Sequence, residues 1–209
     1  MSQTITRLFD NYDDAANAVR ELESLGIAHH DLSIVASNAD NRHRDPRTNA
    51  DEGINKDDDV TKGVTTGTIL GGGAGLLAGL GLLAIPGLGP LVAAGWLAAT
   101  AVGAGVGAIG GGATGTIVGA LKNAGHSDEE ANVYSEGVRR GGSLVSAKVP
   151  DDRVSEVEAV LERNKSVDAH TRGAAYRETG WSNFDESAPA YSANEVAEER
   201  MRYSGERAF

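Results

Sequence analysis

The histidines are the side chains of this sequence best suited to general acid–base chemistry or metal binding near neutral pH. His29 and His30 are adjacent, which is not the spacing of two ligands to one metal, and they fall in an expected turn. His126 precedes a capping sequence, so we expect it to flank a helix start. The order of residues along the chain does not indicate a catalytic triad that combines one of these histidines with a serine and an acidic residue. The five histidines are His29, His30, His43, His126 and His170.

Other patterns could bind nucleotides or cations. Gly105-Val-Gly-Ala-Ile-Gly110 matches the dinucleotide-binding G-x-G-x-x-G, but we expect no strand before it, and no acidic residue follows about 20 positions on. No Gly-Lys-Ser/Thr phosphate loop occurs. Asp57-Asp58-Asp59 lacks the spacing of a Ca²⁺ loop and fits a solvated linker better. The sequence therefore predicts no catalytic residue, no cofactor and no metal site, and we expect a protein that is not an enzyme.

Composition excludes several classes of site and partner. The 209 residues include no cysteine, which rules out disulfides, thiolate metal sites and cysteine nucleophiles. The net charge of −11 argues against a nucleic-acid partner, because that affinity comes mainly from Lys and Arg neutralising phosphates. The chain begins without a basic region followed by an apolar run, so we expect no secretory signal.

Charge is distributed unevenly. Between Lys62 and Lys122 lie 59 consecutive residues without a charged side chain, although 23% of the whole chain is charged. Small residues recur there at every fourth position, which on an α-helix gives a slanted smooth stripe that favours close helix crossings. The first series is Gly63, Gly67, Gly71, Gly75 and Gly79, and the second is Gly95, Ala99, Gly103, Gly107, Gly111, Gly115 and Gly119.

A turn sequence separates the two series. Ile85-Pro86-Gly87-Leu88-Gly89-Pro90 would interrupt any helix. We therefore predict a glycine-zipper helical hairpin with helices at 63–85 and 91–121 and a turn formed by Pro86, Gly87, Gly89 and Pro90. The second helix has another small row, which predicts contact with another copy and hence a homo-oligomer. This row is Ala104, Ala108, Gly112, Thr116 and Ala120.

Both predicted helices are long enough to cross a bilayer. They would span about 34 and 46 Å, against a hydrocarbon thickness of about 30 Å. A soluble hairpin should carry charges on its outer face, and this one has none. We therefore expect a lipid bilayer as partner, namely the inner membrane, with the soluble domain in the cytoplasm. The insertion energy of helix 63–85 is only about −3 to −5 kcal/mol. The alternative is a cytoplasmic protein whose hairpin packs on the sheet or on other copies.

The charged flanks contain two similar strand–helix–strand units. In the first, strands are expected at 4–9 and 32–37, with apolar residues at helical spacing between 15 and 25. In the second, strands at 144–149 and 167–171 enclose a helix whose apolar residues lie between 154 and 161. Ser127-Asp-Glu-Glu130 is a capping box that begins a further helix, ending near Arg140.

Two such units predict an α+β fold. We expect a ferredoxin-like β-α-β-β-α-β sandwich with helices on one face of a four-stranded sheet, whose middle strands pair across the inserted hairpin. The predicted organisation is a split domain formed by 1–38 and 126–173, a flexible polar linker at 39–62, the hairpin at 63–121 and a weakly ordered tail at 174–209. Within the tail, residues 195–206 could dock as a short helix.

Several stretches resemble a known group of proteins. Leu-Phe-Asp-Asn-Tyr-Asp-Asp-Ala at 8–15, Leu-Gly-Ile at 25–27 and Asp-Leu-Ser-Ile-Val at 31–35 resemble the YflT-type general stress protein domain. Leu-Ala-Ile-Pro-Gly-Leu-Gly-Pro at 83–90 and Val-Tyr-Ser-Glu-Gly-Val-Arg-Arg-Gly-Gly at 133–142 are similar to its glycine-zipper members. The resemblance covers about residues 3–180 and implies a bacterial stress protein without known catalysis or site residues to carry over.

These patterns predict a non-enzymatic general stress-response protein that is membrane-associated through a self-associating glycine-zipper hairpin. The alternative is a soluble ligand- or protein-binding module whose hairpin packs on itself or on other copies. The sequence does not indicate which small molecule such a module would bind.

Overall fold

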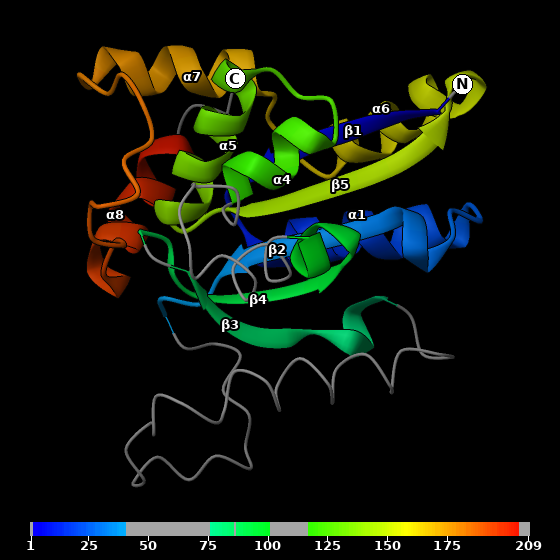
Figure 1. The fold of residues 1–209 in the computed structure, drawn as a ribbon, viewed down its shortest axis with the longest axis horizontal. Helices are drawn as coiled ribbons and strands as arrows, with labels where there is room; N and C mark the ends of the chain where they lie inside the picture. The colour runs from blue at the N-terminus through cyan, green and yellow to red at the C-terminus, as the bar shows by residue number, and fades with distance from the viewer. Residues whose placement is uncertain (1, 41–75, 86, 101–116, 205–209) are drawn as a thin grey trace, which may run out of the picture.

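The computed structural model describes residues 2–40, 76–85, 87–100 and 117–204. This part of the chain is an α+β structure with a five-stranded antiparallel sheet in the order β1-β5-β2-β4-β3 (Figure 1). The strands are β1 (Ser2–Phe9), β2 (Leu32–Ser37), β3 (Gly81–Ile85), β4 (Gly89–Gly95) and β5 (Ser143–Pro150). The helices are α1 (Tyr12–Ser24), α4 (Ile117–Asn123), α5 (Asp128–Arg139), α6 (Val154–Arg163), α7 (Ala169–Glu178) and α8 (Ala193–Ser204). Short 3₁₀ turns lie at His29–Asp31, Leu76–Gly79 and Asp151–Arg153.

The two charged flanks meet in the middle of the sheet. β5 lies between β1 and β2, so that Leu144 pairs with Leu8 on one side and with Val35 on the other. The strands predicted at 4–9, 32–37 and 144–149 are confirmed as parts of β1, β2 and β5. The pairing of β2 with β5 brings together segments that are far apart in the chain, which is possible because closing a longer loop adds little entropy cost.

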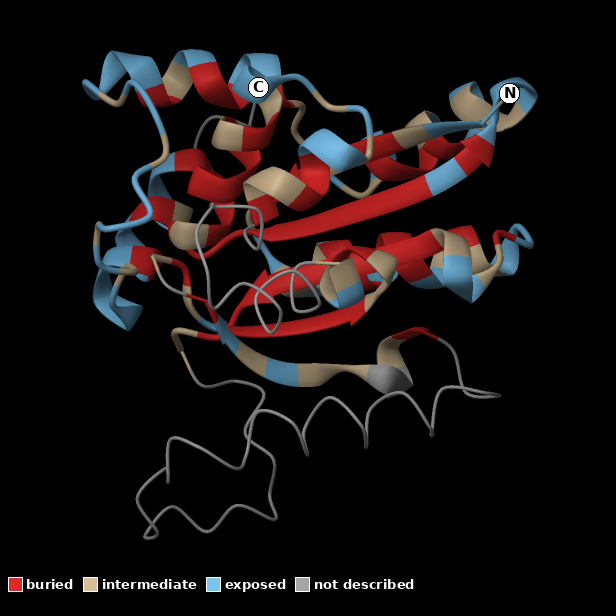
Figure 2. Cartoon of the chain, in the orientation of Figure 1, coloured by how far each residue is buried: buried red, intermediate tan, exposed pale blue. Residues whose placement is uncertain are grey.

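Both faces of the central strands β1, β5 and β2 are covered by helices. Leu8, Val35 and Leu144 pack with residues of α4, α5 and α7, whereas Ile34 and Val145 pack on the opposite face with residues of α1 and α6. Because successive strand residues point to opposite faces, the central strands are buried along most of their length (Figure 2). The prediction that helices cover only one face is therefore wrong.

The predicted helical hairpin is wrong between residues 81 and 95. Residues 81–85 and 89–95 form β3 and β4, which extend the sheet beyond β2. The turn is present but joins two strands: Gly87 and Gly89 have φ angles of +77° and +76°, and Leu88 N–H donates to the Ile85 carbonyl at 3.0 Å. Pro90 lies in β4 opposite Ala84. A short apolar run fits a buried strand as well as a helix, because its periodicity does not separate the two.

Burial explains in part why the residues between Lys62 and Lys122 include no charged side chain. Leu88, Leu91 and Leu97 are almost fully buried, and so are Ile117 and Leu121 of α4. They belong to the same core as α5 and α7. A charged side chain at any of these positions would carry a large desolvation cost. The described residues of the uncharged stretch therefore lack charge in part because they form the core of the protein itself.

Three of the predicted helix-packing glycines lie in the described part of the chain. Gly79 is in the 3₁₀ turn that precedes β3, Gly119 is in α4, and Gly95 ends β4. Gly95 has a φ of +88°, and a Cβ there would lie 2.2 Å from the Leu32 carbonyl oxygen, so its neighbour is a strand backbone and not a helix. Ala120, from the second small row, is buried in the core.

Other predicted positions lie outside the described residues. They include Pro86 of the turn and most of the polar linker at 39–62. The glycines of the two series that lie outside are Gly63, Gly67, Gly71, Gly75, Gly103, Gly107, Gly111 and Gly115.

The C-terminal part differs from the prediction. Of the strand expected at 167–171, only Val167 pairs, in an isolated bridge to Leu8. α7 begins at Ala169 because the Asp168 carboxylate accepts the Thr171 N–H at 2.8 Å and caps the helix. The tail expected to be weakly ordered from residue 174 instead completes α7 and forms α8, the docked helix considered for 195–206.

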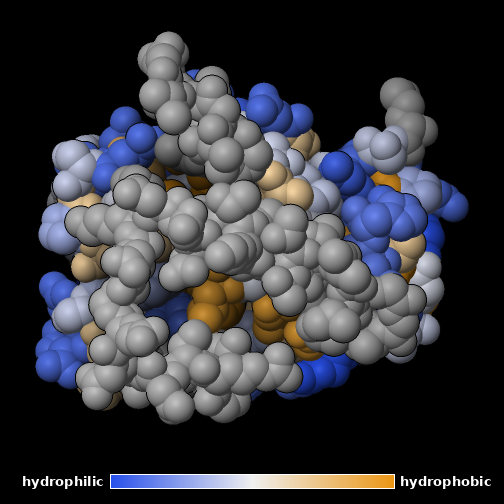
Figure 3. All heavy atoms as spheres, turned by 60° about the horizontal axis from the view of Figure 1, so that its bottom comes forward, coloured by the Kyte–Doolittle hydropathy of each residue, from blue (hydrophilic) through white to orange (hydrophobic). Residues whose placement is uncertain are grey.

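β3 lies at one edge of the described sheet. Turning this side toward the viewer shows hydrophobic residues at the surface (Figure 3), and Leu82 of β3 is 49% exposed. The longest described helix, α1, has 13 residues. Among the described residues, no helix combines the length and apolar character needed to cross a membrane.

Replacing Gly95 with alanine should lower the free energy of unfolding by about 2–4 kcal/mol, because alanine must adopt a positive φ and its Cβ meets the β2 backbone. Urea unfolding measures the loss. Gly26→Ala is the matched control, because Gly26 has a φ of +84° but no atom within 4 Å of the added Cβ. It should cost only about 1–2 kcal/mol. Equal losses in the two variants would contradict the close approach of β2 to Gly95.

Candidate functional site

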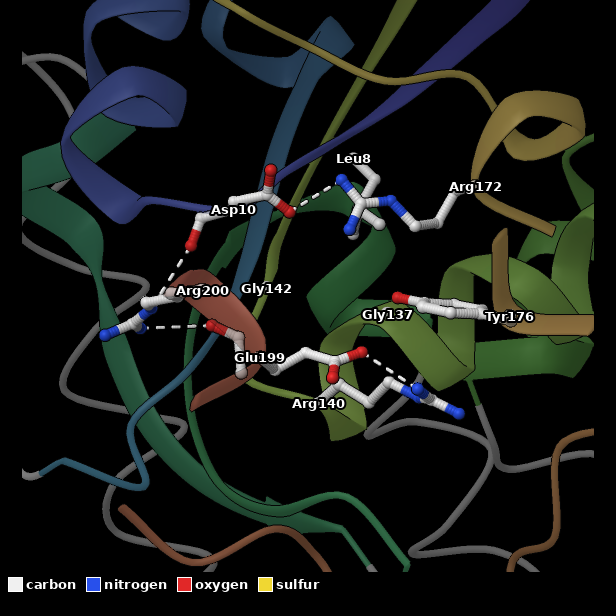
Figure 4. Close-up of a pocket in the computed structure, with 10 residues that line it drawn as sticks. Leu8, Asp10, Gly137, Arg140, Gly142, Arg172, Tyr176, Glu199 and Arg200 are labelled. Atoms are coloured by element: carbon white, nitrogen blue, oxygen red, sulfur yellow. Dashed lines mark hydrogen bonds and ion pairs between the residues drawn. The ribbon is translucent and has the colours of Figure 1, made fainter. Parts of the chain in front are cut away.

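A cluster of buried charges lies where α5, α7 and α8 meet, beside the end of β1 (Figure 4). Arg140 is at its centre: its Nε donates to Glu136 Oε1 at 2.6 Å and its Nη1 to Glu199 Oε1 at 2.8 Å. The guanidinium also lies 4.1 Å from the ring centroid of Tyr176. We call this set, together with Arg172, Arg200 and Asp10, the arginine cluster.

The other two arginines connect further elements to the cluster. Arg172 of α7 forms an ion pair with Asp10 at 2.7 Å and lies 3.8 Å from the ring centroid of Tyr203 in α8. Arg200 of α8 donates to the Asp40 carboxylate at 3.0 Å, to the Gly141 carbonyl at 3.1 Å and to the Asp10 carbonyl at 3.2 Å. Asp40 is the last described residue before residue 76. Arg200 therefore attaches α8 to the end of the first described segment.

Electrostatics keep the cluster in one charge state. Burial by itself lowers the pKa of Arg140, but hydrogen bonds to Glu199 and Glu136 outweigh it and raise the pKa above its ordinary value. Burial raises the pKa of Tyr176, although the nearby Arg172 and Arg140 oppose this. The arginine therefore stays charged and the tyrosine neutral at physiological pH. Neither group is poised to exchange a proton, which argues against acid–base catalysis here.

The cluster leaves almost no empty space. The cavity among Leu8, Arg140, Arg172 and Glu199 has a volume of about 10 Å³, roughly the space of one water molecule. Arg140 and Arg172 are each occupied by a carboxylate of the protein itself. The arrangement attaches α7 and α8 to the body and does not form a substrate chamber.

The residues after α7 form a strap that we call the C-terminal arm, residues 181–204. It crosses the β3–β4 turn before it reaches the cluster. A Cβ on Gly87 would lie 2.6 Å from the Glu186 carbonyl oxygen, and one on Gly89 would lie 2.7 Å from the Ala190 side chain. The two predicted turn glycines therefore have a second role, because they let the arm approach the turn.

A second buried polar cluster lies over the centre of β1 and β5. Thr6 Oγ1 is 2.7 Å from His126 Nε2 and 2.9 Å from Ser146 Oγ, and the Tyr134 hydroxyl donates to the Thr6 carbonyl at 2.7 Å. Burial raises the pKa of Tyr134 to about 12, so this hydroxyl keeps its proton.

The helix that carries Tyr134 begins as the sequence predicts. The capping box is confirmed: the Glu130 N–H donates to Ser127 Oγ at 3.2 Å, and the Ser127 N–H donates to Glu130 Oε2 at 2.9 Å. These two bonds fix the start of α5 directly after His126, and so they hold the histidine at the sheet.

This second cluster has the residue types of a hydroxyl–histidine–carboxylate triad but not its geometry. His126 Nδ1 is 3.8 Å from Glu130 Oε2, which is too long for the hydrogen bond that orients a catalytic imidazole. Thr6 and Ser146 are fully buried, so no substrate carbonyl reaches either hydroxyl. His126 therefore does more than flank the helix start, because it joins the α4–α5 connection to the sheet.

A wider groove of about 420 Å³ lies between α4, α5 and the start of the C-terminal arm. Val118 and Trp181 supply its apolar part and Asn132 an amide. Two ion pairs lie along it, Lys122 with Asp128 and Arg177 with Glu129. This is the size of a small-molecule site, although both cations already have acidic partners.

The arginine cluster does not follow from the sequence patterns. Its ion pairs join residues such as Arg140 and Glu199, which lie 59 positions apart and reveal no pattern along the chain. One local signal was available, since Glu136 and Arg140 have the spacing of an ion pair on a helix. Among the described residues, no group of three or more acidic or histidine side chains is placed to hold a metal ion.

Comparison of the chain with protein-family models, curated proteins and solved structures gave no match. The resemblance to the YflT-type domain therefore stays a prediction.

Arg140→Ala should lower the free energy of unfolding by about 2–3 kcal/mol, because two buried carboxylates each lose one of their two arginine partners. Glu136 keeps Arg139, and Glu199 keeps Arg202. Thermal or urea unfolding measures the effect. Arg163→Ala is the matched control, because Arg163 pairs with Glu21 at the exposed surface, and we expect little change. Similar losses in the two variants would mean that the arginine cluster does not hold α8.

The free energy of unfolding should decrease in mild acid, because His126 binds a proton less readily in the folded protein than in the unfolded chain. Burial lowers its pKa, Glu130 opposes this and Arg7 adds to the lowering; Tyr134 is the other titratable group beside the ring. The unfolded chain, with a histidine pKa of about 6.5, therefore takes up the proton first. Stabilisation is complete above about pH 6.5 and is lost as the pH falls through the folded pKa.

The test compares urea unfolding at about pH 7.5 and pH 5. His126→Asn should lose less stability over this range than the wild type. His30→Asn, at an exposed side chain, should behave like the wild type. If His126→Asn loses as much stability over this pH range as the wild type, His126 is not the group responsible.

Proposed function

We propose that this chain is a non-enzymatic stress-response protein that associates with a membrane, and with other copies of itself, through the uncharged glycine-rich stretches 63–75 and 103–115. The soluble body lies on the cytoplasmic side, and the stretches are its attachment points. The stress-response label rests on the resemblance to the YflT-type domain.

The closed character of the described body carries this proposal. Both faces of the central strands are covered, the charges of the arginine cluster are paired, and the cavity inside it is about 10 Å³. An active site needs a water-excluding chamber with groups poised to move protons or electrons, and the two buried polar clusters lack these. A scaffold role fits such a body better than a catalytic one.

The glycine rows support the attachment role. Because residues 81–85 and 89–95 form strands, the i+4 rows that remain are Gly63–Gly75 and Gly103–Gly115. None of the residues in these two stretches is charged, a composition typical of surfaces that contact lipid or another small-residue surface. The described body contributes β3 and β4 between the two rows.

We also propose that the core of the body is ferredoxin-like. Two β-α-β units interleave: β5 lies between β1 and β2, and β1 lies between β5 and the Val167 bridge. α1 and α6, the helices of the two units, share one face. In this proposal β3, β4, α4 and α5 are additions that extend the sheet and cover its second face.

Replacing Gly107 and Gly111 together with leucine should weaken self-association about tenfold, because leucine keeps helix backbones apart where glycine allows contact. Sedimentation in mild detergent measures the association. The control is Val106→Leu with Ala113→Leu, which adds bulk to the same stretch but off both small-residue rows. Equal association in the two double variants would contradict the proposed role of the rows.

Fractionation of cells before and after a carbonate wash tests the membrane part separately. Protein that resists the wash and needs detergent supports the proposal. Protein found only in the soluble fraction contradicts it and favours the second candidate, a soluble binding module. The groove of about 420 Å³ beside Trp181 is the observation in favour of that candidate.

A further inference from the structure

His126 connects two helices and the sheet at a single point. Its N–H donates to the Leu121 carbonyl at 3.1 Å, and Gly125, with a φ of +100°, completes the C-terminal turn of α4. The next residue, Ser127, is the N-cap of α5. The chain therefore turns from α4 into α5 at His126, whose side chain contacts the sheet. We call α4, this connection and the first turn of α5, residues 117–131, the helix corner.

The imidazole of His126 lies among neutral groups. Its Nε2 is 2.7 Å from Thr6 Oγ1, which is in turn 2.9 Å from Ser146 Oγ. The Tyr134 ring packs edge-on against it, with 6.0 Å between the ring centroids, and the His126 side chain is only 9% exposed. This site suits a neutral imidazole, whereas a buried imidazolium needs a paired anion.

The carboxylate beside the ring is already engaged. Glu130 Oε2 accepts the Ser127 N–H and the Ser127 hydroxyl, each at 2.9 Å, as part of the capping box. The same oxygen is 3.8 Å from His126 Nδ1, which is too long for a hydrogen bond. To pair with a protonated His126, Glu130 must give up the bonds that cap α5, and this weakens the start of the helix.

The other charged side chains on the surrounding elements do not replace Glu130. Both acidic groups among them are engaged, one in the ion pair with Lys122 at 2.5 Å and one in capping α7. Burial lowers the pKa of His126, Glu130 opposes this and Arg7 adds to the lowering. The set consists of Arg7 of β1, Lys122 of α4, Asp128 of α5, Lys148 of β5 and Asp168 at the start of α7.

The helix corner is held less firmly than its surroundings. β5 has paired strands on both sides, and the C-terminal end of α5 is fixed by the ion pairs of Arg140 with Glu136 and Glu199. The corner is helical, so no strand ladder joins it to the sheet. It is attached by the polar contact of His126 and by buried apolar side chains such as Leu121. A segment attached in this way opens at a lower free energy than the sheet.

We propose that His126 is an acid switch, whose protonation releases the helix corner while the sheet and the C-terminal half of α5 stay folded. In the released form the imidazolium reaches water. Release also exposes Ile117 and Leu121, which are fully buried in the closed form. Mild acid therefore gives the protein an apolar surface that it lacks at neutral pH.

This inference goes beyond the proposed function, because it uses neither the glycine-rich stretches nor lipid. It also differs from the predicted loss of overall stability in acid, which does not state where the structure opens. A protein that loses stability in acid only by unfolding as a whole has no such switch.

Hydrogen exchange in the full-length protein tests the switch, because exchange follows the population of the open form. The open form binds a proton at the ordinary histidine pKa of about 6.5, so its population should rise up to about tenfold for each pH unit below this value. The amides of Leu121 and Ala131 report on the helix corner, and those of Val145 and Ala147 report on β5.

After correction for the intrinsic exchange rate, the corner amides should lose protection between about pH 7.5 and pH 5, while the β5 amides keep theirs. An equal loss at both sets means that the protein opens as a whole, and this overturns the proposal. Unchanged protection of the corner amides overturns it as well.

Two variants separate His126 from other effects of acid. His126→Asn cannot take up the proton, so its corner amides should show no additional loss over the same range. His30→Asn, at an exposed side chain, should respond like the wild type. If the corner amides of His126→Asn lose as much protection as those of the wild type, another group is responsible and the proposal fails.

A measurement on the wild type covers the case in which His126→Asn does not fold. The ring resonance of His126 is followed by NMR through the same titration. Corner protection should fall for as long as the ring is neutral in the closed form and should level off once the ring is protonated, because the two forms then bind the proton equally. A loss that stops before the ring titrates, or continues after it, contradicts the switch.

Discussion

The pairing of β2 with β5 is the interaction on which the rest of the structure depends. It places Val35 beside Leu144 and thereby turns two separate strand–helix–strand segments into one sheet. Once β2 has β5 on one side, its other side is open to receive β4, and β4 in turn receives β3. The ends of the long central stretch are held at this sheet as well, so its described residues build the outer strands and the second helical layer.

The central stretch shows how one composition serves two purposes. Small, uncharged residues allow close helix contacts, but they equally allow tightly packed strands and turns. Gly87 and Gly89 supply the positive φ angles of the β3–β4 turn and leave room for the C-terminal arm, while Gly95 leaves room for the β2 backbone. The buried leucines of β4 and α4 contribute the apolar area that a protein with few aromatic residues still needs for stability.

The sequence predicted best what depends on local pattern. The capping box at Ser127, the α+β class and three of the strands follow from short-range signals. The hairpin helices were wrong at residues 81–95, because periodicity in a short apolar run does not distinguish a buried strand from a helix. The strand predicted at 167–171 is limited to the Val167 bridge, because the Asp168 cap starts α7 directly after it. The arginine cluster was not foreseen, since Arg172 with Asp10 and Arg140 with Glu199 are brought together only by the tertiary fold.

The position of β5 also has a consequence for synthesis of the protein on the ribosome. β1 is made first, yet its partner strand begins at Ser143. At about 5–20 residues per second, β1 waits about 7–27 s for that partner to be translated. During this time β1 and β2 are open strand edges on an unfinished chain, the state that chaperones bind. A protein with this order of strands is therefore more exposed to aggregation while it is being made than after it has folded.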